Sequence, residues 1–264
     1  MFVVAAVVLA SAVLIQATVL SGNGRVTTSL IPSAAKSVAS GASGQPGSAA
    51  ATPAAPLVPL PEGSPVRGSG AYESFGLRVV SDVPFTRPVS CGEASCQIKL
   101  DIYVPAGLGP FPTVVLIRGG PSGVGGRSYL DPFATELAKV GILVFNADYR
   151  DIASQGGGYP TAFQDVACAI HFARSEGSRY NGDSGPITLV GHSLGGWVGS
   201  VVALDPATFV GGCLADGSGR PDAFVGLAGN YQIDTGKNES DLLMFFGGSD
   251  ATTAAARAAS NPFN

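Results

Sequence analysis

The stretch ITLVGHSLGGWVGSVVAL, residues 187–204, decides the fold that this chain can adopt. Its first residues are apolar and β-branched, as is typical of a buried strand, and residues 194–204 have the small and apolar character of a buried helix. Between them lies GHSLG, residues 191–195, which matches the pattern G-x-S-x-G. Glycines suit such a tight turn because a side chain there would meet the adjoining strand and helix. The stretch therefore predicts a strand, a sharp turn and a helix, with Ser193 exposed at the turn.

Ser193 is the candidate nucleophile of this motif. A serine on a strained turn between a strand and a helix presents its hydroxyl at the edge of the sheet. The N–H groups that begin the following helix favour negative charge, and the N–H of Leu194 is the one next to the serine. In acyl-transfer hydrolases, such an N–H binds the oxyanion that forms when the serine attacks a carbonyl. We therefore expect Leu194 to contribute to an oxyanion hole.

A second glycine-rich turn follows an earlier apolar run. The run PTVVLIRGG, residues 112–120, is continuously apolar, as in a buried strand, and ends in Gly119 and Gly120. If both runs belong to one sheet, these two glycines lie at the same edge as Ser193. We expect their N–H groups to serve as oxyanion donors, and loss of one such donor typically costs about 100- to 1000-fold in rate. The alternative is that the two glycines only form a turn.

Strands and helices alternate along the chain from about Tyr72. In QIKLDIYVP, residues 97–105, the period of two places Ile98, Leu100 and Ile102 on one face. This alternation predicts an α/β class, with a mainly parallel sheet and helices on both faces. The expected strands are 77–85, 97–105, 112–120, 142–150, 187–193 and 223–229, and the expected helices are 131–140, 161–176 and 194–204.

Residues 97–230 resemble the α/β-hydrolase superfamily, particularly its carboxylesterase and feruloyl-esterase-like branch. The motifs that carry the resemblance are, in chain order, RGG (118–120), FNADYR (145–150), QDV (164–166), NGD (181–183) and ITLVGHSLGGW (187–197). The resemblance implies a serine hydrolase that cleaves a small-molecule carboxylic ester through an acyl-enzyme on Ser193, with no metal and no organic cofactor. Within these motifs, we expect residues 148–150 to form a structural network beside the sheet.

Two departures from the family pattern limit this assignment. The family has His-Gly-Gly where this chain has Arg118-Gly119-Gly120, so the backbone donors are kept and a charge is added. The family's base is a histidine that follows the acid, whereas the only histidines here are His171 and His192. We expect neither to be the base, because His192 adjoins Ser193 in sequence and His171 falls within a helix. The simplest expectation is that the 264 residues lack the final strands and the base, so that this chain alone is inactive.

The acid of the triad is ambiguous. In LLMFFGGSD, residues 242–250, Asp250 either ends a strand and serves as the acid, or lies in a surface turn that precedes the acid-bearing strand. The alternative to an esterase is a catalytically silent domain of this fold that serves binding, or a peptidase or lipase on the same scaffold.

The N-terminal part of the chain predicts export. Residues 2–20 carry no charge and would span roughly 28 Å as a helix, close to the thickness of a bilayer core. We expect residues 1–24 to be a signal peptide or a membrane anchor, and residues 25–71, rich in Ala, Ser, Gly and Pro, to be a disordered linker. The α/β-hydrolase domain is expected over residues 72–264. The protein is then extracellular, in the cell envelope or membrane-anchored.

Cysteine usage and charge add two further expectations. Four cysteines suit two disulfides in an exported protein, with Cys91 and Cys96 closing a short loop and Cys168 and Cys213 left to pair; the alternative is four free buried thiols. Their spacing matches no zinc motif. Acidic residues outnumber basic ones, 19 to 15, and no basic run occurs, so nucleic acid is an unexpected partner.

Overall fold

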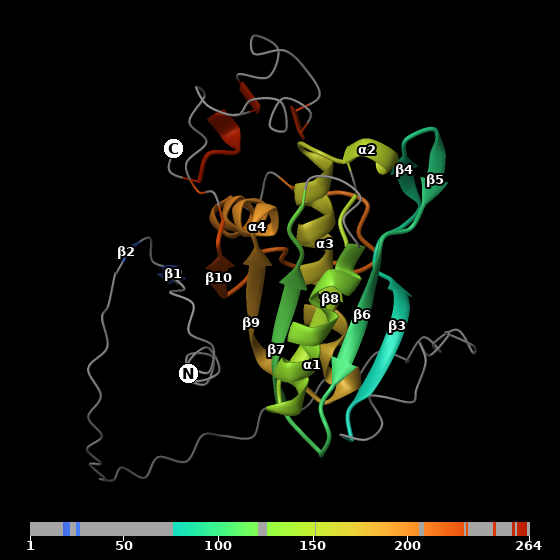
Figure 1. Ribbon diagram of the computed structural model, residues 1–264, viewed down its shortest axis with the longest axis vertical. Helices are drawn as coiled ribbons and strands as arrows, with labels where there is room; N and C mark the ends of the chain where they lie inside the picture. The colour runs from blue at the N-terminus through green and yellow to red at the C-terminus, as the bar shows by residue number, and fades with distance from the viewer. Residues whose placement is uncertain are drawn as a thin grey trace, which may run out of the picture.

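The computed structural model describes residues 18–21, 25–26, 76–120, 126–150, 152–205, 209–229, 231, 245–246, 255–256 and 258–262. Within these residues, one large sheet has the strand order β2-β1-β10-β9-β7-β8-β6-β3, and β4 and β5 form a separate hairpin (Figure 1). The strands are β1 (Thr18–Ser21), β2 (Arg25–Val26), β3 (Arg78–Pro84), β4 (Val89–Cys91), β5 (Ala94–Cys96), β6 (Lys99–Val104), β7 (Phe111–Ile117), β8 (Leu143–Ala147), β9 (Gly182–His192) and β10 (Ala223–Leu227).

The four central strands are parallel, as the alternation of strands and helices predicts. β8, β7, β9 and β10 lie side by side in this order, and β6, β3 and β1 join the sheet through antiparallel pairs. β7 and β9 are neighbours, and Ile117 pairs with Gly191 at their carboxyl ends. The turns that follow these two strands therefore lie at the same edge of the sheet, as expected for the two glycine-rich motifs.

Helices cover both faces of the sheet and bury alternate residues of each strand. The helices are α1 (Asp131–Lys139), α2 (Ile152–Gln155), α3 (Thr161–Glu176) and α4 (Leu194–Leu204), with short 3-10 helices η4 (Gly126–Leu130) and η5 (Gly177–Tyr180). Val115 and Ile117 of β7 belong to the apolar core that includes α3 and α4. Val114 and Leu116 belong to a second core that includes α1. Figure 1 shows α1 on the opposite side of β7 and β8 from α3, so the α/β class is confirmed.

Two predicted strands end earlier than their sequence suggests. The strand expected over 112–120, with its glycines at the end, stops at Ile117 in β7. The strand expected over 142–150 ends at Ala147. After β7 the carbonyls of Arg118 and Gly120 bond to side chains, and after β8 the Asp148 N–H still bonds to Lys99 of β6 but the Arg150 N–H bonds to the Asp165 carboxylate.

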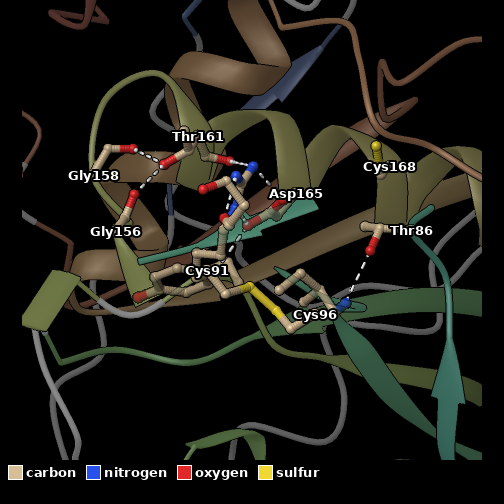
Figure 2. Close-up of polar contacts among 12 residues, drawn as sticks. Thr86, Cys91, Cys96, Gly156, Gly158, Thr161, Asp165 and Cys168 are labelled. Carbon is tan, nitrogen blue, oxygen red and sulfur yellow. Dashed lines mark hydrogen bonds and ion pairs between the residues drawn. A yellow bond between two sulfur atoms is a disulfide. The ribbon is translucent and has the colours of Figure 1, made fainter. Parts of the chain in front are cut away.

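Both expected disulfides form, Cys91–Cys96 and Cys168–Cys213, and the described residues contain no free cysteine. The first closes the β4–β5 hairpin, and the second joins α3 to the segment ahead of β10. Figure 2 shows the Cys91–Cys96 bridge and the polar contacts of Asp165 in α3. Two disulfides are compatible with an exported protein.

The buried pair Arg150–Asp165 explains why this hairpin lies against α3. The Arg150 guanidinium donates two hydrogen bonds of 2.9 Å to the Asp165 carboxylate. It also donates to the carbonyl oxygens of Ser90 in β4 and Thr161 in α3. The network expected beside the sheet for residues 148–150 is therefore present, and it ties the end of β8 to the hairpin and to α3.

The N-terminal expectations are mostly outside the described residues, including residues 1–17 of the apolar segment and nearly all of the linker. Residues 18–20, expected to end an apolar helix, are instead extended in β1, which pairs with the edge of β10. An edge strand presents unpaired N–H and C=O groups, which an extended segment can satisfy. No helix among the described residues is both long enough and apolar enough to cross a membrane.

Candidate functional site

The turn after β9 has the strained backbone that the G-x-S-x-G pattern predicts. Ser193 has φ 52° and ψ −117°, a region of backbone conformation that residues with a side chain rarely adopt. Hydrogen bonds on both sides hold this conformation: the Ser193 N–H donates to the carbonyl oxygen of Leu227 at 2.7 Å, and the Ser193 carbonyl accepts from Gly196 at 2.9 Å. The turn therefore presents Ser193 at the carboxyl edge of the sheet, between β9 and α4.

The glycines of the motif are required by the close approach of backbone atoms. A Cβ added at Gly191 would overlap the carbonyl oxygen of Gly195, and one added at Gly195 would overlap the carbonyl oxygen of Arg118. No flexible side chain can move aside at either place, because both obstacles are backbone. The sequence pattern thus has the steric cause that was inferred for it.

The turn after β7 lies directly against the serine. A Cβ added at Gly119 would lie 2.7 Å from Cβ of Ser193 and 2.9 Å from the carbonyl oxygen of His192. Gly120 follows with φ 87°, a conformation that favours glycine. Leu194 is the first residue of α4, so its N–H is one of those that a helix leaves without an intrahelical acceptor. The structure therefore places Gly119 and Leu194 next to Ser193, with Gly120 following Gly119 in the same turn.

Arg118, the departure from the family pattern, is buried and does not face the serine. Its side chain is 4% exposed, and its guanidinium lies 4.5 Å from the centre of the Tyr149 ring. It donates to the carbonyl oxygens of Gly119 and Gly120, each at 3.2 Å. The Arg118 guanidinium is thus bonded to the backbone of the glycine turn.

His192 lies beside the nucleophile without bonding to it. Its ring stacks on Tyr129 of η4, with ring centres 5.9 Å apart, and Tyr129 is 57% exposed. Nδ1 of His192 is buried and has no hydrogen-bond partner among the described residues. His192 therefore makes no hydrogen bond through Nδ1 to the Ser193 hydroxyl, as expected from its place in the sequence.

His171 lies at the opposite edge of the sheet. It belongs to α3, and its Nε2 would be 2.8 Å from a Cβ added at Gly219, in the segment ahead of β10. Ala223 at the start of β10 pairs with Thr188, whereas Ser193 follows the end of β9. Five residues of strand separate these positions by roughly 17 Å. His171 is therefore a packing residue, as expected.

Lowering the pH should reduce the free energy of unfolding through protonation of His171. Burial, and next the charge of Arg174, lower the pKa of His171 below its usual value of 6.5, while Asp216 acts in the opposite sense. A lowered pKa means that the unfolded chain binds the proton more readily, so the stability that neutral His171 contributes is full above pH 6.5 and falls as the pH drops through it. We expect His171→Gln to flatten the pH dependence of the free energy of unfolding between pH 7.5 and about pH 5, measured in urea. Identical slopes for the two proteins would contradict this.

The predicted acid, Asp250, lies outside the described residues. Nearby, Phe245 and Ser260 pack against α4: Nε1 of Trp197 donates to the carbonyl oxygen of Ser260 at 2.9 Å, and its ring lies 4.8 Å from that of Phe245. Trp197 is 2% exposed and belongs to the apolar core. Among the described residues, no group of three or more His, Cys, Asp or Glu side chains could hold a metal ion.

A buried network behind the glycine turn was missed from sequence. Arg127 of η4 pairs with Asp82, Asp101 at 2.9 Å and Asp148 at 2.7 Å. Burial lowers the pKa of Arg127, but the hydrogen bonds and charges of Asp101 and Asp148 outweigh it and raise that pKa. One signal in the sequence could have indicated this network. Charged residues make up only 13% of the chain, and Asp101 lies inside an apolar strand, where a buried charge needs a partner.

Comparison with known proteins extends these observations. Residues 100–218 match the BD-FAE family model. The chain is 28% identical over 138 residues to the isoprenylcysteine alpha-carbonyl methylesterase ICME of Arabidopsis thaliana, covering 51% of this chain and 32% of that protein. It is 31% identical over 134 residues to the probable carboxylic ester hydrolase LipM of Mycobacterium tuberculosis, covering 49% and 31%. The chain thus spans about a third of the length of these curated relatives.

A solved structure shares the arrangement of the sheet and helices. The bifunctional GH43-CE protein of Bacteroides eggerthii has a TM-score of 0.55 and 26% sequence identity with this chain. The match covers 62% of this chain and 24% of that one. The similarity supports the fold and leaves the substrate open.

Proposed function

We propose that the protein hydrolyses carboxylic esters through an acyl-enzyme on Ser193, because residues 100–218 match the BD-FAE family model and the curated relatives are esterases. The Ser193 hydroxyl attacks the ester carbonyl and forms a tetrahedral intermediate, whose oxyanion accepts hydrogen bonds from the N–H groups of Gly119, Gly120 and Leu194. The alcohol leaves, and water then releases the acid from Ser193. No step requires a metal ion or an organic cofactor.

The main observation that supports this proposal is the strained backbone conformation of Ser193. A residue with φ 52° and ψ −117° costs of order 1–3 kcal/mol, which persists only where the surrounding structure enforces it. Here the hydrogen bonds to Leu227 and Gly196 enforce it, and Gly119 lies against the strained residue. Strain of this kind at a half-buried serine, beside a second glycine-rich turn, supports nucleophilic chemistry over a passive binding surface.

Activation of Ser193 needs a base, and neither His171 nor His192 is placed for that role. We propose that the base is a histidine that these 264 residues do not include, and that the acid is either Asp250 or a residue beyond it. The whole protein then works outside the cytoplasm, in keeping with its two disulfides, on a small-molecule ester.

Two preparations test this proposal: the protein expressed from its complete reading frame, and the 264-residue chain. We expect the first to hydrolyse p-nitrophenyl acetate and to be labelled on Ser193 by a fluorophosphonate, with the labelled peptide identified by mass spectrometry. We expect the second to show neither reaction at a comparable rate. Absence of both reactions in the complete protein would favour a silent binding domain. Preference for long-chain esters or peptides would favour a lipase or a peptidase.

A further inference from the structure

Three consecutive carbonyl groups in the glycine turn are bonded to side chains. The Arg118 carbonyl accepts a hydrogen bond of 3.2 Å from the Tyr149 hydroxyl. The carbonyls of Gly119 and Gly120 each accept one from Nη1 of Arg118 at 3.2 Å, and Gly120 also accepts from Tyr149 at 3.5 Å. The Arg118 side chain thus bonds to the backbone of the two residues that directly follow it.

These bonds fix the direction of the peptide N–H groups. In a trans peptide unit, the C=O and the following N–H point in opposite directions. The bonded carbonyl of Arg118 therefore turns the N–H of Gly119 away from Tyr149, and the bonded carbonyl of Gly119 turns the N–H of Gly120 away from the Arg118 guanidinium. Among the described residues, no hydrogen bond joins either N–H to a backbone acceptor.

Asp148 holds the guanidinium in this position. It follows β8 directly, and its carboxylate accepts from Nε of Arg118 at 3.4 Å. The same carboxylate accepts from the Arg127 N–H and from Nη1 of Arg127, both at 2.7 Å. Arg118 and Arg127 flank residues 119–126 in the sequence. The Asp148 carboxylate therefore binds a residue at each end of this glycine-rich segment. Its charge also balances that of Arg118 within a buried site.

We propose that Arg118 and Asp148 are positioning residues for the oxyanion hole. Asp148 holds the Arg118 guanidinium beneath the carbonyls of Gly119 and Gly120, and the guanidinium orients their N–H groups before a substrate binds. Preorganised donors stabilise an oxyanion without the energetic cost of turning toward it during the reaction. This role rests on the proposed ester hydrolysis, and it explains how an arginine replaces the histidine of the family pattern.

The test combines kinetics with backbone dynamics in the complete protein. Arg118→Met should lower kcat for p-nitrophenyl acetate by about 100-fold and leave KM within about threefold, because only the transition state carries the oxyanion. Arg118→Lys should recover part of kcat, because an ammonium can reach one carbonyl and cannot bridge two carbonyls and Asp148 together. Arg174→Met removes an arginine at the opposite edge, paired with Asp222, and should leave kcat unchanged.

A second measurement does not depend on activity. ¹⁵N relaxation should give order parameters near 0.85 for the N–H groups of Gly119 and Gly120 in the wild type, and values below about 0.6 in Arg118→Met and Asp148→Asn. Unchanged order parameters together with kcat within twofold of the wild type would overturn the proposal. If the wild type hydrolyses no ester, the proposed function fails, and the order parameters alone decide whether Arg118 and Asp148 fix the turn.

Discussion

Replacing Ser193 with alanine should reduce ester hydrolysis by about 10⁴- to 10⁶-fold and abolish labelling by a fluorophosphonate. Removal of a serine nucleophile costs this much because the base, the acid and the serine act as one unit, and the remaining rate comes from the oxyanion donors and substrate binding. The measurement is kcat/KM for p-nitrophenyl acetate, with substrate and product concentrations followed for long enough to detect a residual rate of this size.

A second substitution of Ser193 should reveal its backbone strain through the free energy of unfolding. Ser193→Gly removes the side chain from a backbone with φ 52°, so we expect the variant to be inactive and more stable than the wild type by about 1 kcal/mol. The matched control is Ser200→Gly within α4, where glycine should destabilise by about 1 kcal/mol or more because the backbone there is helical. Equal effects of the two substitutions on the urea midpoint would contradict the assigned strain.

Replacing Arg150 with methionine should produce the largest loss of stability, about 3–5 kcal/mol. The side chains of Arg150 and Asp165 are only 7% and 2% exposed, and they meet through two hydrogen bonds of 2.9 Å. Removal of the cation leaves a buried carboxylate that keeps a hydrogen bond from the backbone N–H of residue 150 and has no balancing charge, and it also frees the carbonyls of Ser90 and Thr161. The measurement is the free energy of unfolding in urea with both disulfides intact.

Two further variants separate this effect from simple loss of a charge. The double variant Arg150→Met/Asp165→Leu should recover much of the stability, because apolar residues of similar size can replace a buried ion pair. Lys139→Met, which breaks the exposed pair with Glu136, should cost no more than about 1 kcal/mol. A loss at Arg150 as small as the loss at Lys139 would show that the buried pair contributes little.

The fold could be predicted because its signals are local. The strands and helices around GHSLG follow from apolar periodicity, and α3 occupies the residues expected for it, 161–176. The steric need for glycine at 191 and 195 follows from the tightness of the turn alone. The position of Gly119 beside Ser193 could also be predicted from the sequence, because parallel strands bring their carboxyl ends to one edge of the sheet.

The residues around the site could not be predicted, because their partners are distant in the sequence. Arg118 meets Asp148 and Tyr149 thirty residues away, and Arg127 meets Asp82 across 45 residues. No period or motif encodes such pairs, since they depend on the order of strands in the sheet. The pairing of β1 with β10 was missed for a related reason: residues 18–20 are apolar enough for a helix, and only the open strand edge selects the extended form.

The adjacency of β7 and β9 has a consequence for how activity arises during folding. The two turns that meet at Ser193 and Gly119 belong to strands paired at Ile117 and Gly191, and β8, α1, α2 and α3 lie between these strands in the sequence. Closing so long a segment is slow relative to local helix formation, because its entropy is lost before its contacts form. An intermediate with formed helices and unpaired central strands therefore has no assembled site. Recovery of fluorophosphonate labelling after dilution from urea should lag behind recovery of the helical circular dichroism signal.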